Sequence, residues 1–466
     1  MKICVVGTGY VGLVSGTCLA EVGHDVVCVD IDAAKVARIN RGEPPIHEDG
    51  LEALLASNVA KAAGRGTDGA KGGLRATTSL ADAMDGAEVA LICVGTPFDG
   101  RTIDLSYVRQ VAREIGTVLK TSTHYCVVTV KSTVVPGTTD TVVREELERA
   151  SGKTAGREFG LGMNPEFLAE GVAVKDFMTP DRVVVGGIDE RSTKVLADMY
   201  AMFEGVPIVR TTTRTAEMIK YTSNAFMATM ISFSNEIARI CDGVGELDVA
   251  EVFKGVHLMK HLTRRGDDGR LTTAGASSFL WAGCGFGGSC FPKDVKAIAA
   301  HAGKRGVATP LLDSVLEINK TQPARMLALL KDRIGSIAGK RIAVLGVAFK
   351  PGTDDVRESP ALPIIADLLA AGATVVAHDP IATETGPRGL ADFGVDASKV
   401  AFAASLADAL KDADAAMLVT SWPEYRDVPA LLGRLGRSVP LIDGRRFLAR
   451  DSVAQYSGIG LSVSAG

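Results

Sequence analysis

The chain has 466 residues, of which 46% are hydrophobic and 23% are charged, and its formal net charge is −4. A chain of this length and composition is expected to fold into two or three globular domains. The slightly negative charge gives no electrostatic reason to expect nucleic acid or an anionic membrane as a partner. No stretch approaches the ~20 apolar residues that span a bilayer, so we expect no membrane segment.

The eight cysteines form no CxxC pair, which argues against a zinc cluster, and we predict no metal. Four of them lie inside apolar, strand-like runs, namely Cys4, Cys28, Cys93 and Cys126. A chain with this much core does not need a disulfide framework. We therefore expect free thiols in a reducing, cytoplasmic compartment.

The N-terminal segment carries a pattern that is typical of dinucleotide binding. Lys2 to Val6 predicts a buried strand, and Gly7-Thr8-Gly9-Tyr10-Val11-Gly12 follows it before a helix to about Val22. A second strand ends at Asp30, about 20 residues later, as this motif requires. The glycines would let a pyrophosphate approach the helix N-terminus. Asp30 would bind the ribose hydroxyls and repel a 2′-phosphate, which predicts NAD, although Lys35 leaves NADP as an alternative.

The strand–helix alternation continues through apolar runs at 89–94 and 125–130. Ligands bind beyond the C-terminal ends of the strands in an open parallel sheet. Thr96 and Thr133, which follow these two runs, are therefore candidate cofactor contacts. Residues 59–79 are rich in glycine, alanine and lysine and predict a surface excursion.

An acidic block follows, Asn164-Pro165-Glu166-Phe167-Leu168-Ala169-Glu170-Gly171. In a helical turn its two glutamates, Glu166 and Glu170, would share a face. Paired acids suit acid–base chemistry, although solvated surface acids are the commoner alternative. Residues 181–187, which contain three consecutive valines, then predict the strand that closes the sheet.

From Thr215 to about Cys241, apolar residues recur at intervals of three and four residues, and the segment contains no proline or glycine. This predicts a helix of about 27 residues and ~40 Å, suited to a domain spine or a dimer interface. Lys220 and Asn224 would share one face, where they could stabilise an oxyanion or form a solvated polar stripe. Residues 263–278 are polar and glycine-rich and predict a loop.

Cys290 follows a glycine-rich loop and precedes a predicted helix over 295–302. Pro292 favours a helix start, so Cys290 should lie just before the helix N-terminus. The helix dipole and Lys293 would favour a thiolate there, and Gly287 would let the backbone come close to a reacting group. Cys290 is thus a candidate nucleophile, and the alternative is a small buried residue.

The pattern of the first strand returns at Lys340 to Gly346, and Asp379 ends a second strand as Asp30 does. These repeats predict a second Rossmann-like domain, which lacks the GxGxxG loop. Its predicted strand-end loops carry Phe349-Lys350, Arg357 and Arg445-Arg446 instead. Cations at these positions suit a phosphorylated ligand that differs from the first one.

Together these motifs resemble the UDP-glucose 6-dehydrogenase family of nucleotide-sugar dehydrogenases, over nearly the whole chain. The segments that carry the resemblance are Gly7 to Gly12, Lys131-Ser132-Thr133, Asn164 to Gly171, Lys220 with Asn224, Gly285 to Asp294, and Phe349-Lys350 with Arg357. The resemblance implies an α/β fold with two Rossmann-like doubly wound domains joined by a central helical domain with a long spine helix. The three domains would cover residues 1–205, 206–325 and 326–466.

The resemblance also implies a reaction, the NAD-dependent four-electron oxidation of UDP-glucose to UDP-glucuronate. Cys290 would attack the intermediate aldehyde to give a thiohemiacetal and then a thioester. Asp294 and Lys220 would hold a water that accepts the first proton, and Glu166 would assist hydrolysis. Lys220 and Asn224 would stabilise the oxyanions. A covalent cysteine intermediate would prevent escape of the reactive aldehyde.

Further roles follow from the motifs and the resemblance together. Thr133 is an additional candidate in the catalytic set. The candidate cofactor contacts are Gly7, Gly9, Tyr10, Val11, Gly12, Asp30, Lys35, Thr96, Thr133, Glu170 and Arg357. The candidate contacts of the sugar nucleotide are Glu166, Phe167, Leu168, Lys220, Asn224, Gly287, Phe349, Lys350 and Arg445.

The sequence leaves several alternatives open. The substrate could be GDP-mannose, dTDP-glucose or UDP-N-acetylmannosamine, and the chain could be a two-electron hydroxyacid dehydrogenase or a non-catalytic nucleotide-sugar-binding protein. Many members of the family carry an arginine before the GFGGSC segment that reaches the partner subunit's sugar site. No arginine in residues 255–265 can be matched to it. The long helix nevertheless predicts a homodimer or a higher homo-oligomer.

Overall fold

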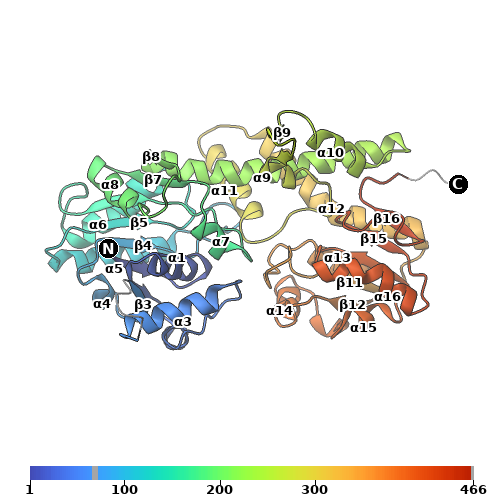
Figure 1. Cartoon of the computed structure of the whole chain (residues 1–466), viewed down its shortest axis with the longest axis horizontal. Coiled ribbons are helices and arrows are strands. Elements are labelled where there is room, and N and C mark those ends of the chain that lie inside the picture. Colours follow the sequence, from blue (N-terminus) through green and yellow to red (C-terminus); the bar gives the residue numbers. More distant parts are fainter. Residues whose placement is uncertain (66–71, 463–466) are drawn as a thin grey trace. The chain divides into compact units, whose positions relative to one another are not determined.

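The computed structural model describes residues 1–65 and 72–462. The chain divides into two compact units, Met1–Ser223 and Asn224–Gly466, with the boundary inside helix α9 (Thr213–Val244). Each unit contains one large sheet with helices on both faces (Figure 1). These features confirm the predicted α/β class.

The first sheet has eight strands among the described residues, in the order β3-β2-β1-β4-β5-β6-β7-β8. In chain order the strands are β1 (Lys2–Val6), β2 (Asp25–Val29), β3 (Gly73–Thr77), β4 (Val89–Ile92), β5 (Val127–Val130), β6 (Gly160–Met163), β7 (Val183–Gly187) and β8 (Ile208–Thr211). Neighbouring strands are parallel except β6 and β7. The winding reverses between β1 and β4, which is where doubly wound sheets bind ligands. The prediction that residues 181–187 close this sheet was wrong, because β8 pairs with β7 beyond them.

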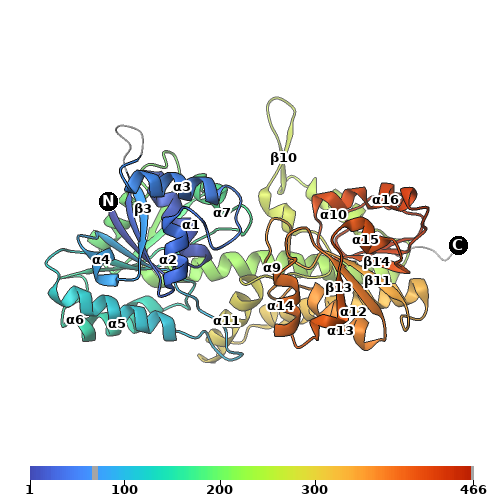
Figure 2. The same ribbon diagram turned by 90° about the horizontal axis from the view of Figure 1, so that it is seen from below.

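Both faces of this sheet are covered, which explains its nearly continuous apolar strands. Ile3 and Val5 of β1 face a core shared with α1 (Tyr10–Glu21) and α3 (Leu51–Ala62). Cys4 and Val6 face the opposite core, shared with α5 (Ser106–Thr121) and α6 (Arg144–Ser151). Figure 2 shows these helix pairs on the two sides of the sheet. The other helices of this unit are α2 (Ala33–Asn40), α4 (Leu80–Met84), the π-helical turn η1 (Thr138–Val143), α7 (Ala173–Met178) and α8 (Glu190–Asp198).

Residues 59–79 are not a surface excursion as a whole. Helix α3 continues to Ala62, and strand β3 begins at Gly73 with Leu74 and Ala76 buried. The glycine and lysine content concealed this short buried strand. Residues 66–71, in the middle of the segment, lie outside the described residues.

The second sheet has the order β13-β12-β11-β14-β15-β16, and all its neighbouring strands are parallel. In chain order the strands are β11 (Arg341–Leu345), β12 (Thr374–His378), β13 (Val400–Phe402), β14 (Ala415–Leu418), β15 (Leu441–Asp443) and β16 (Tyr456–Gly458). In Figure 2, α12 and α13 lie on one face and α15 and α16 on the other. The helices of this half are α12 (Pro310–Ile334), α13 (Ala361–Ala370), α14 (Thr385–Asp392), η3 (Ala397–Lys399), α15 (Leu406–Leu410), η4 (Pro423–Asp427) and α16 (Val428–Arg434). The predicted second Rossmann-like domain is confirmed.

The turn after β11 is closed by the protein's own side chains. Asp379, which follows β12 and is 3% exposed, accepts hydrogen bonds from the backbone N–H groups of Val347 and Ala348 at 2.8 and 2.9 Å. The same carboxylate oxygen accepts a hydrogen bond from Trp422 Nε1 at 3.1 Å. The donors at this turn therefore already have partners within the domain.

The part of the chain that follows the first sheet and precedes the second is mainly helical. Helix α9 has 32 residues and extends beyond both predicted ends, and α10 (Val249–His257) and α11 (Phe291–Gly303) follow it. Residues 263–278 are not a plain loop, because β9 (Thr263–Arg265) and β10 (Leu271–Thr273) pair as an antiparallel hairpin before the 3₁₀ turn η2 (Gly275–Phe279). Within residues 1–65 and 72–462, no helix combines the length and apolarity needed to cross a membrane.

Candidate active site

The glycine loop after β1 leaves open space at the start of α1. Gly7 has a left-handed φ of +99°, and a Cβ on Gly12 would lie 1.9 Å from the Gly7 carbonyl oxygen. A Cβ on Gly9, which caps α1, would meet no atom within 4 Å. No side chain caps the N–H groups at this helix start. An open helix N-terminus of this kind fits a pyrophosphate.

Asp30 directly follows β2 and is held by the same loop. Its Oδ2 accepts hydrogen bonds from Thr8 N at 3.0 Å and from Thr8 Oγ1 at 2.5 Å. Burial acts to raise the pKa of Asp30, but the hydrogen bonds from Thr8 and Asp32 and the charge of Lys35 outweigh it and lower that pKa. Asp30 is thus an anion at the strand end, where the prediction placed the ribose contact.

Glu48 joins the glycine loop to the end of the acidic block. Tyr10 OH donates a hydrogen bond to this buried carboxylate, which also accepts from Gly171 N and Ala173 N, each at 2.7 Å. Burial, together with the Glu48 and Glu170 carboxylates, raises the pKa of Tyr10 well above its usual range. The Tyr10 side chain therefore serves the protein, and the backbone N–H remains for a cofactor. Sequence reasoning missed Glu48 because it lies in a loop without a motif.

Thr96 and Thr133 meet at the C-terminal ends of β4 and β5. The Thr96 hydroxyl donates a hydrogen bond of 2.8 Å to the Thr133 carbonyl oxygen. Thr96 is buried and Thr133 is half-buried. The structure thus brings these two candidates together at the predicted edge of the sheet.

The acidic block is not helical, so the expectation that Glu166 and Glu170 share a helix face was wrong. Residues 164–169 have no regular secondary structure, and α7 begins only at Ala173. Pro165 disfavours a helical conformation at the residue before it. The Glu166 carboxylate instead accepts a hydrogen bond of 2.6 Å from Leu168 N.

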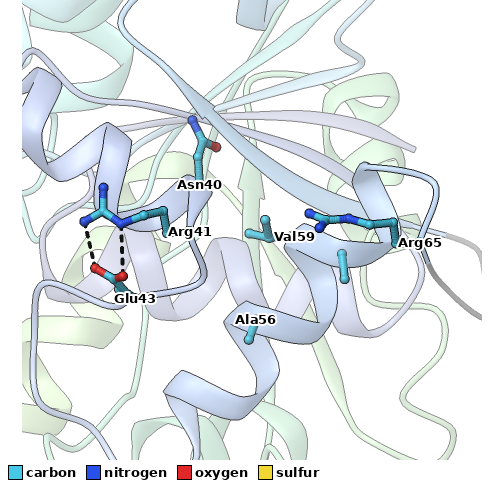
Figure 3. Close-up of a pocket in the computed structure, with 7 residues that line it drawn as sticks. Asn40, Arg41, Glu43, Ala56, Val59 and Arg65 are labelled. Atoms are coloured by element: carbon cyan, nitrogen blue, oxygen red, sulfur yellow. Dashed lines mark hydrogen bonds and ion pairs between the residues drawn. The ribbon is translucent and has the colours of Figure 1, made fainter.

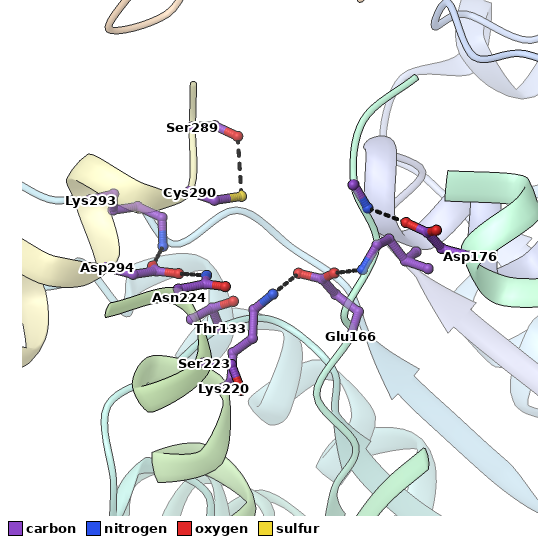
Figure 4. A network of polar contacts seen from close by, with 12 residues as sticks. Thr133, Glu166, Asp176, Lys220, Ser223, Asn224, Ser289, Cys290, Lys293 and Asp294 are labelled. Carbon is purple, nitrogen blue, oxygen red and sulfur yellow. Dashed lines mark hydrogen bonds and ion pairs between the residues drawn. The ribbon is translucent and has the colours of Figure 1, made fainter. Parts of the chain in front are cut away.

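Glu166 forms a buried ion pair with Lys220 of α9 (Figure 4). The distance from Lys220 Nζ to Glu166 Oε1 is 2.9 Å. The Lys220 side chain is 4% exposed and the Glu166 side chain is 6% exposed. Burial acts to raise the pKa of Glu166, but Lys220, the Leu168 N–H and the charge of Lys131 lower it below its ordinary value. The Phe167 ring lies beside this pair, 5.5 Å from Lys220 Nζ and 4.1 Å from Arg182 Cζ.

Lys220 and Asn224 face the same side of α9, and both are 4% exposed. The alternative of a solvated polar stripe is therefore wrong. Asn224 Nδ2 donates a hydrogen bond of 2.6 Å to Asp294 Oδ2. The other oxygen of Asp294 pairs with Lys293 Nζ at 2.5 Å, so Lys293 serves this carboxylate (Figure 4).

Cys290 is the N-cap residue of α11, which confirms the predicted placement just before a helix start. It is half-buried, whereas the other seven cysteines are buried, and all eight are free thiols. Ser289 Oγ lies 3.6 Å from its Sγ. Partial exposure at a helix N-terminus favours a reactive thiol over a structural one.

Buried amides hold the loop that leads to Cys290. Gly283 N donates to Asn235 Oδ1 at 2.7 Å, and its carbonyl accepts from Gln322 Nε2 at 2.6 Å. Asn319 Oδ1 accepts from Phe286 N at 2.8 Å. Sequence reasoning missed these side chains. Their signal was a pair of polar residues three apart, Asn319 and Gln322, inside a helix.

The same loop, which belongs to the second unit, contacts residues of that unit that are candidates for binding the sugar nucleotide. The Phe349 ring packs on Gly288, whose N–H donates to the Arg357 carbonyl at 2.9 Å. Arg445 Nη1 donates to the Gly285 carbonyl at 2.9 Å. A Cβ on Gly287 would lie 2.4 Å from the Glu358 carbonyl oxygen, so close backbone packing requires this glycine.

Lys350 and Arg357 stand at loop positions, as predicted. Lys350 Nζ lies 5.7 Å from the neighbouring Phe349 ring. The Arg357 guanidinium pairs with Asp355 at 2.7 Å, and its side chain remains 65% exposed. The guanidinium is therefore paired with a carboxylate and still largely accessible to solvent.

A separate cavity of about 600 Å³ lies between α2 and α3 of the first unit (Figure 3). Its lining residues are Asn40, Arg41, Glu43, Ala56, Val59, Ala60 and Arg65. None of the predicted site residues lines it. Arg41 is paired with Glu43 at its wall.

Three family models match consecutive parts of the chain. They describe the UDP-glucose/GDP-mannose dehydrogenase family and cover its NAD binding domain at residues 1–204, its central domain at 214–321 and its UDP binding domain at 343–450. The chain belongs to the UDP-glucose/GDP-mannose dehydrogenase family.

Individual members of this family match over most of the chain. A UDP-glucose 6-dehydrogenase of Haloferax volcanii is 41% identical and the match covers 98% of this chain and 100% of the relative. A GDP-mannose 6-dehydrogenase of Pseudomonas putida is 40% identical over 81% of each chain. The solved UDP-glucose dehydrogenase of Pyrobaculum islandicum has a TM-score of 0.84 at 34% identity, covering 98% of this chain and 97% of that one.

Glu217 is a further residue of this dehydrogenase that sequence reasoning missed. It lies on α9, three residues before Lys220, and is fully buried. Its carboxylate accepts hydrogen bonds from Gly137 N at 2.6 Å and from Thr139 N and Oγ1 at 2.8 and 2.7 Å. Glu217 thereby ties α9 to the segment that follows Thr133. A glutamate in an amphipathic helix gave no sequence signal for this role.

The Glu217 carboxyl should make stability depend on pH. Burial raises the pKa of Glu217 from 4.5 to about 7, although its hydrogen bonds act to lower it. Between these values the folded protein holds a proton that the unfolded chain releases. This contribution to stability is therefore full below pH 4.5 and is lost as the pH rises through about 7, by ~3 kcal/mol in total.

Glu217→Gln removes this titration. In urea unfolding, we expect the stability of the variant relative to wild type to improve by ~3 kcal/mol between pH 5 and pH 8. A difference that stays constant over this range would mean that Glu217 is already ionised in the folded protein at pH 5.

Proposed function

We propose that the chain is an NAD-dependent UDP-glucose 6-dehydrogenase, which removes four electrons from C6 of the glucose unit and yields UDP-glucuronate. The observation that carries the proposal is the half-buried Cys290 thiol at the start of α11. A two-electron dehydrogenase of hydroxyacids has no use for a nucleophile at this position. The printed activity of the Haloferax volcanii relative supports the same substrate.

The proposed chemistry assigns each residue one task. Bound NAD supplies the hydride acceptor for both oxidations. Asp294 and Lys220 hold the water that takes the hydroxyl proton as the C6 aldehyde forms. Cys290 Sγ then adds to the aldehyde carbon, and Lys220 and Asn224 stabilise the oxyanion of the thiohemiacetal.

Loss of the second hydride leaves a thioester on Cys290. Glu166 takes a proton from water as the water oxygen attacks the thioester carbonyl, and the Cys290 thiolate leaves. The products are the carboxylate and the free enzyme. An ionised Glu166, favoured by its lowered pKa, can serve as this base.

The remaining site residues keep their proposed binding roles. For NAD these are Gly7, Gly9, Tyr10, Val11, Gly12, Asp30, Lys35, Thr96, Thr133, Glu170 and Arg357. For the sugar nucleotide they are Glu166, Phe167, Leu168, Lys220, Asn224, Gly287, Phe349, Lys350 and Arg445. We also propose three functional domains, 1–205, 206–325 and 326–466.

The decisive experiment is the yield of NADH at 340 nm from a limiting, known amount of UDP-glucose with excess NAD. Two NADH per sugar would support four-electron oxidation. One NADH per sugar would mean that the protein is a simple two-electron alcohol dehydrogenase. The similarity to GDP-mannose 6-dehydrogenase makes GDP-mannose the second candidate substrate. A panel of GDP-mannose, dTDP-glucose and UDP-N-acetylmannosamine, each with NAD, separates these possibilities. Tight binding without NADH formation would indicate a non-catalytic protein.

Two glycine variants test the cofactor site. In Gly9→Ala the new methyl enters open space, so we expect unchanged thermal stability but a KM for NAD that rises tenfold or more. In Gly12→Ala the methyl meets the Gly7 carbonyl at 1.9 Å, so the melting temperature should fall as well. A Gly9→Ala enzyme with an unchanged KM for NAD would place the pyrophosphate elsewhere.

We further propose a homodimer or higher homo-oligomer and a cytoplasmic location. The eight free thiols favour a reducing compartment. Phe226, Phe233 and Ile240 recur every seven residues on α9 and are 58%, 50% and 53% exposed. Such an apolar stripe suits a helix of a second copy.

Phe226→Glu should place a charge in that stripe and shift the protein toward monomers. Sedimentation velocity at micromolar concentrations measures the shift. Lys194→Glu on the exposed face of α8 serves as the control for added charge. Equal association of both variants would exclude this face of α9 as the interface.

A further inference from the structure

Lys131 places an ammonium group inside the first unit. It directly follows β5 and is 3% exposed. Its Nζ donates hydrogen bonds to Asn164 Oδ1 at 3.0 Å and to Tyr200 OH at 3.4 Å. Tyr200 OH also donates to Asn164 Oδ1 at 2.6 Å. Both acceptors are uncharged, although burying a lysine is costly unless a negative charge lies nearby.

That negative charge is Glu166. The charge of Lys131 helps to lower the pKa of Glu166, after the larger effect of Lys220. The Cys93 thiol, beyond β4, is a further titratable group near Lys131 and Glu166. Burial raises the pKa of Cys93 to about 12, so this thiol stays neutral. The positive charges of Lys131, which follows β5, and of Lys220, on α9, therefore both lower the pKa of one carboxylate.

Lys131 also holds the backbone that carries Glu166. Its partner Asn164 lies two residues before Glu166, and Asn164 Nδ2 donates a hydrogen bond of 2.9 Å to the Val184 carbonyl of β7. On the other side of Glu166, the carboxylate itself binds Leu168 N. The irregular segment 164–168 is thus anchored at both ends, and Lys131 is part of the first anchor.

We propose that Lys131 is a positioning residue that orients Glu166 through Asn164 and keeps it anionic while Lys220 serves the substrate. This inference rests on the proposed function. Lys220, which pairs with Glu166 in the structure (Figure 4), is also assigned to the oxyanion. A lysine engaged by the substrate compensates Glu166 less, and Lys131 then supplies the remaining positive charge.

The consequence concerns the last chemical step. Thioester hydrolysis requires an ionised Glu166 to take the proton of the attacking water. Both hydride transfers precede this step and do not use Glu166 as a base. Loss of the Lys131 charge should therefore slow hydrolysis selectively, and a higher pH should restore it by ionising Glu166 again.

The test compares Lys131→Met with wild type and with Lys153→Met, which removes an ammonium group that donates a hydrogen bond to the Ser122 carbonyl. At pH 7 we expect a burst of two NADH per active site and then turnover slowed tenfold or more. Intact mass should show a sugar-nucleotide adduct on Cys290. The acid limb of the kcat profile should move up to about pH 8, which a tenfold deficit at pH 7 requires, and the deficit should shrink at pH 9.

Several outcomes separate the possibilities. A rate lowered equally at every pH, without an adduct, would overturn the inference and leave Lys131 a structural role. Lys131→Gln keeps N–H donors for Asn164 and Tyr200 and should reproduce the shift if the Met variant does not fold. Failure of both to fold would also assign a purely structural role. A wild-type enzyme that yields fewer than two NADH per sugar would instead contradict the proposed function.

Discussion

Cys290→Ser is expected to abolish formation of UDP-glucuronate, with kcat reduced on the order of 10³-fold or more. A serine hydroxyl at the start of α11 is a far weaker nucleophile than a thiolate, and the serine alkoxide is a poorer leaving group than the cysteine thiolate. The first oxidation does not use the thiol. The variant should therefore still reach the aldehyde level, and NADH formation should stop near one equivalent per active site.

The matched control is Cys284→Ser, six positions earlier in the same loop. Cys284 Sγ lies 3.5 Å from the Val419 carbonyl, and a serine hydroxyl can keep this hydrogen bond. This variant should retain wild-type stoichiometry. Product analysis by anion-exchange chromatography, together with NADH absorbance, distinguishes the two variants. Two NADH per sugar from Cys290→Ser at an undiminished rate would mean that no covalent intermediate forms on Cys290.

Lys220→Met is expected to reduce both stability and activity. Removing one member of a buried ion pair leaves the other charge uncompensated, which costs about 3–5 kcal/mol. Because Lys131 remains near Glu166, we expect the lower end of this range. Activity should fall by ~10²–10³-fold, since the proposed oxyanion loses a donor. Urea unfolding and steady-state kinetics measure the two effects.

A double variant and a surface control test this prediction further. Adding Glu166→Gln to Lys220→Met removes the orphaned charge, so stability should partly recover while activity does not. Lys194→Met breaks the exposed pair with Asp198 on α8 and should change stability by less than about 0.5 kcal/mol. If Lys220→Met cost no more stability than Lys194→Met, the buried pair would contribute nothing to the fold.

Local pattern was sufficient to predict much of the fold. The strand at 2–6, the glycine turn and the placement of Cys290 before a helix each depend on residues adjacent in sequence. The weakly patterned segments were harder. The prediction missed the short strand β3 within a glycine-rich stretch and β8 at the edge of the sheet. In both cases partners far along the chain decide the structure, and they leave no local periodicity.

The candidate site shows the same division. Sequence motifs identified Glu166, Lys220, Asn224 and Asp294, but they did not show that Glu166 pairs with Lys220 or that Asn224 binds Asp294. The supporting residues were missed because their signals are weak. Glu217 resembles any polar residue of an amphipathic helix, and its role depends on a loop some 80 positions away.

The turn after β11 bears on whether the second Rossmann-like domain also binds a dinucleotide. In the first sheet α1 begins at Tyr10, directly after the turn that follows β1, whereas the next helix after β11, α13, begins only at Ala361. A repeated Rossmann-like fold therefore does not imply two dinucleotides per polypeptide. Calorimetric titration with NAD should give a stoichiometry of one.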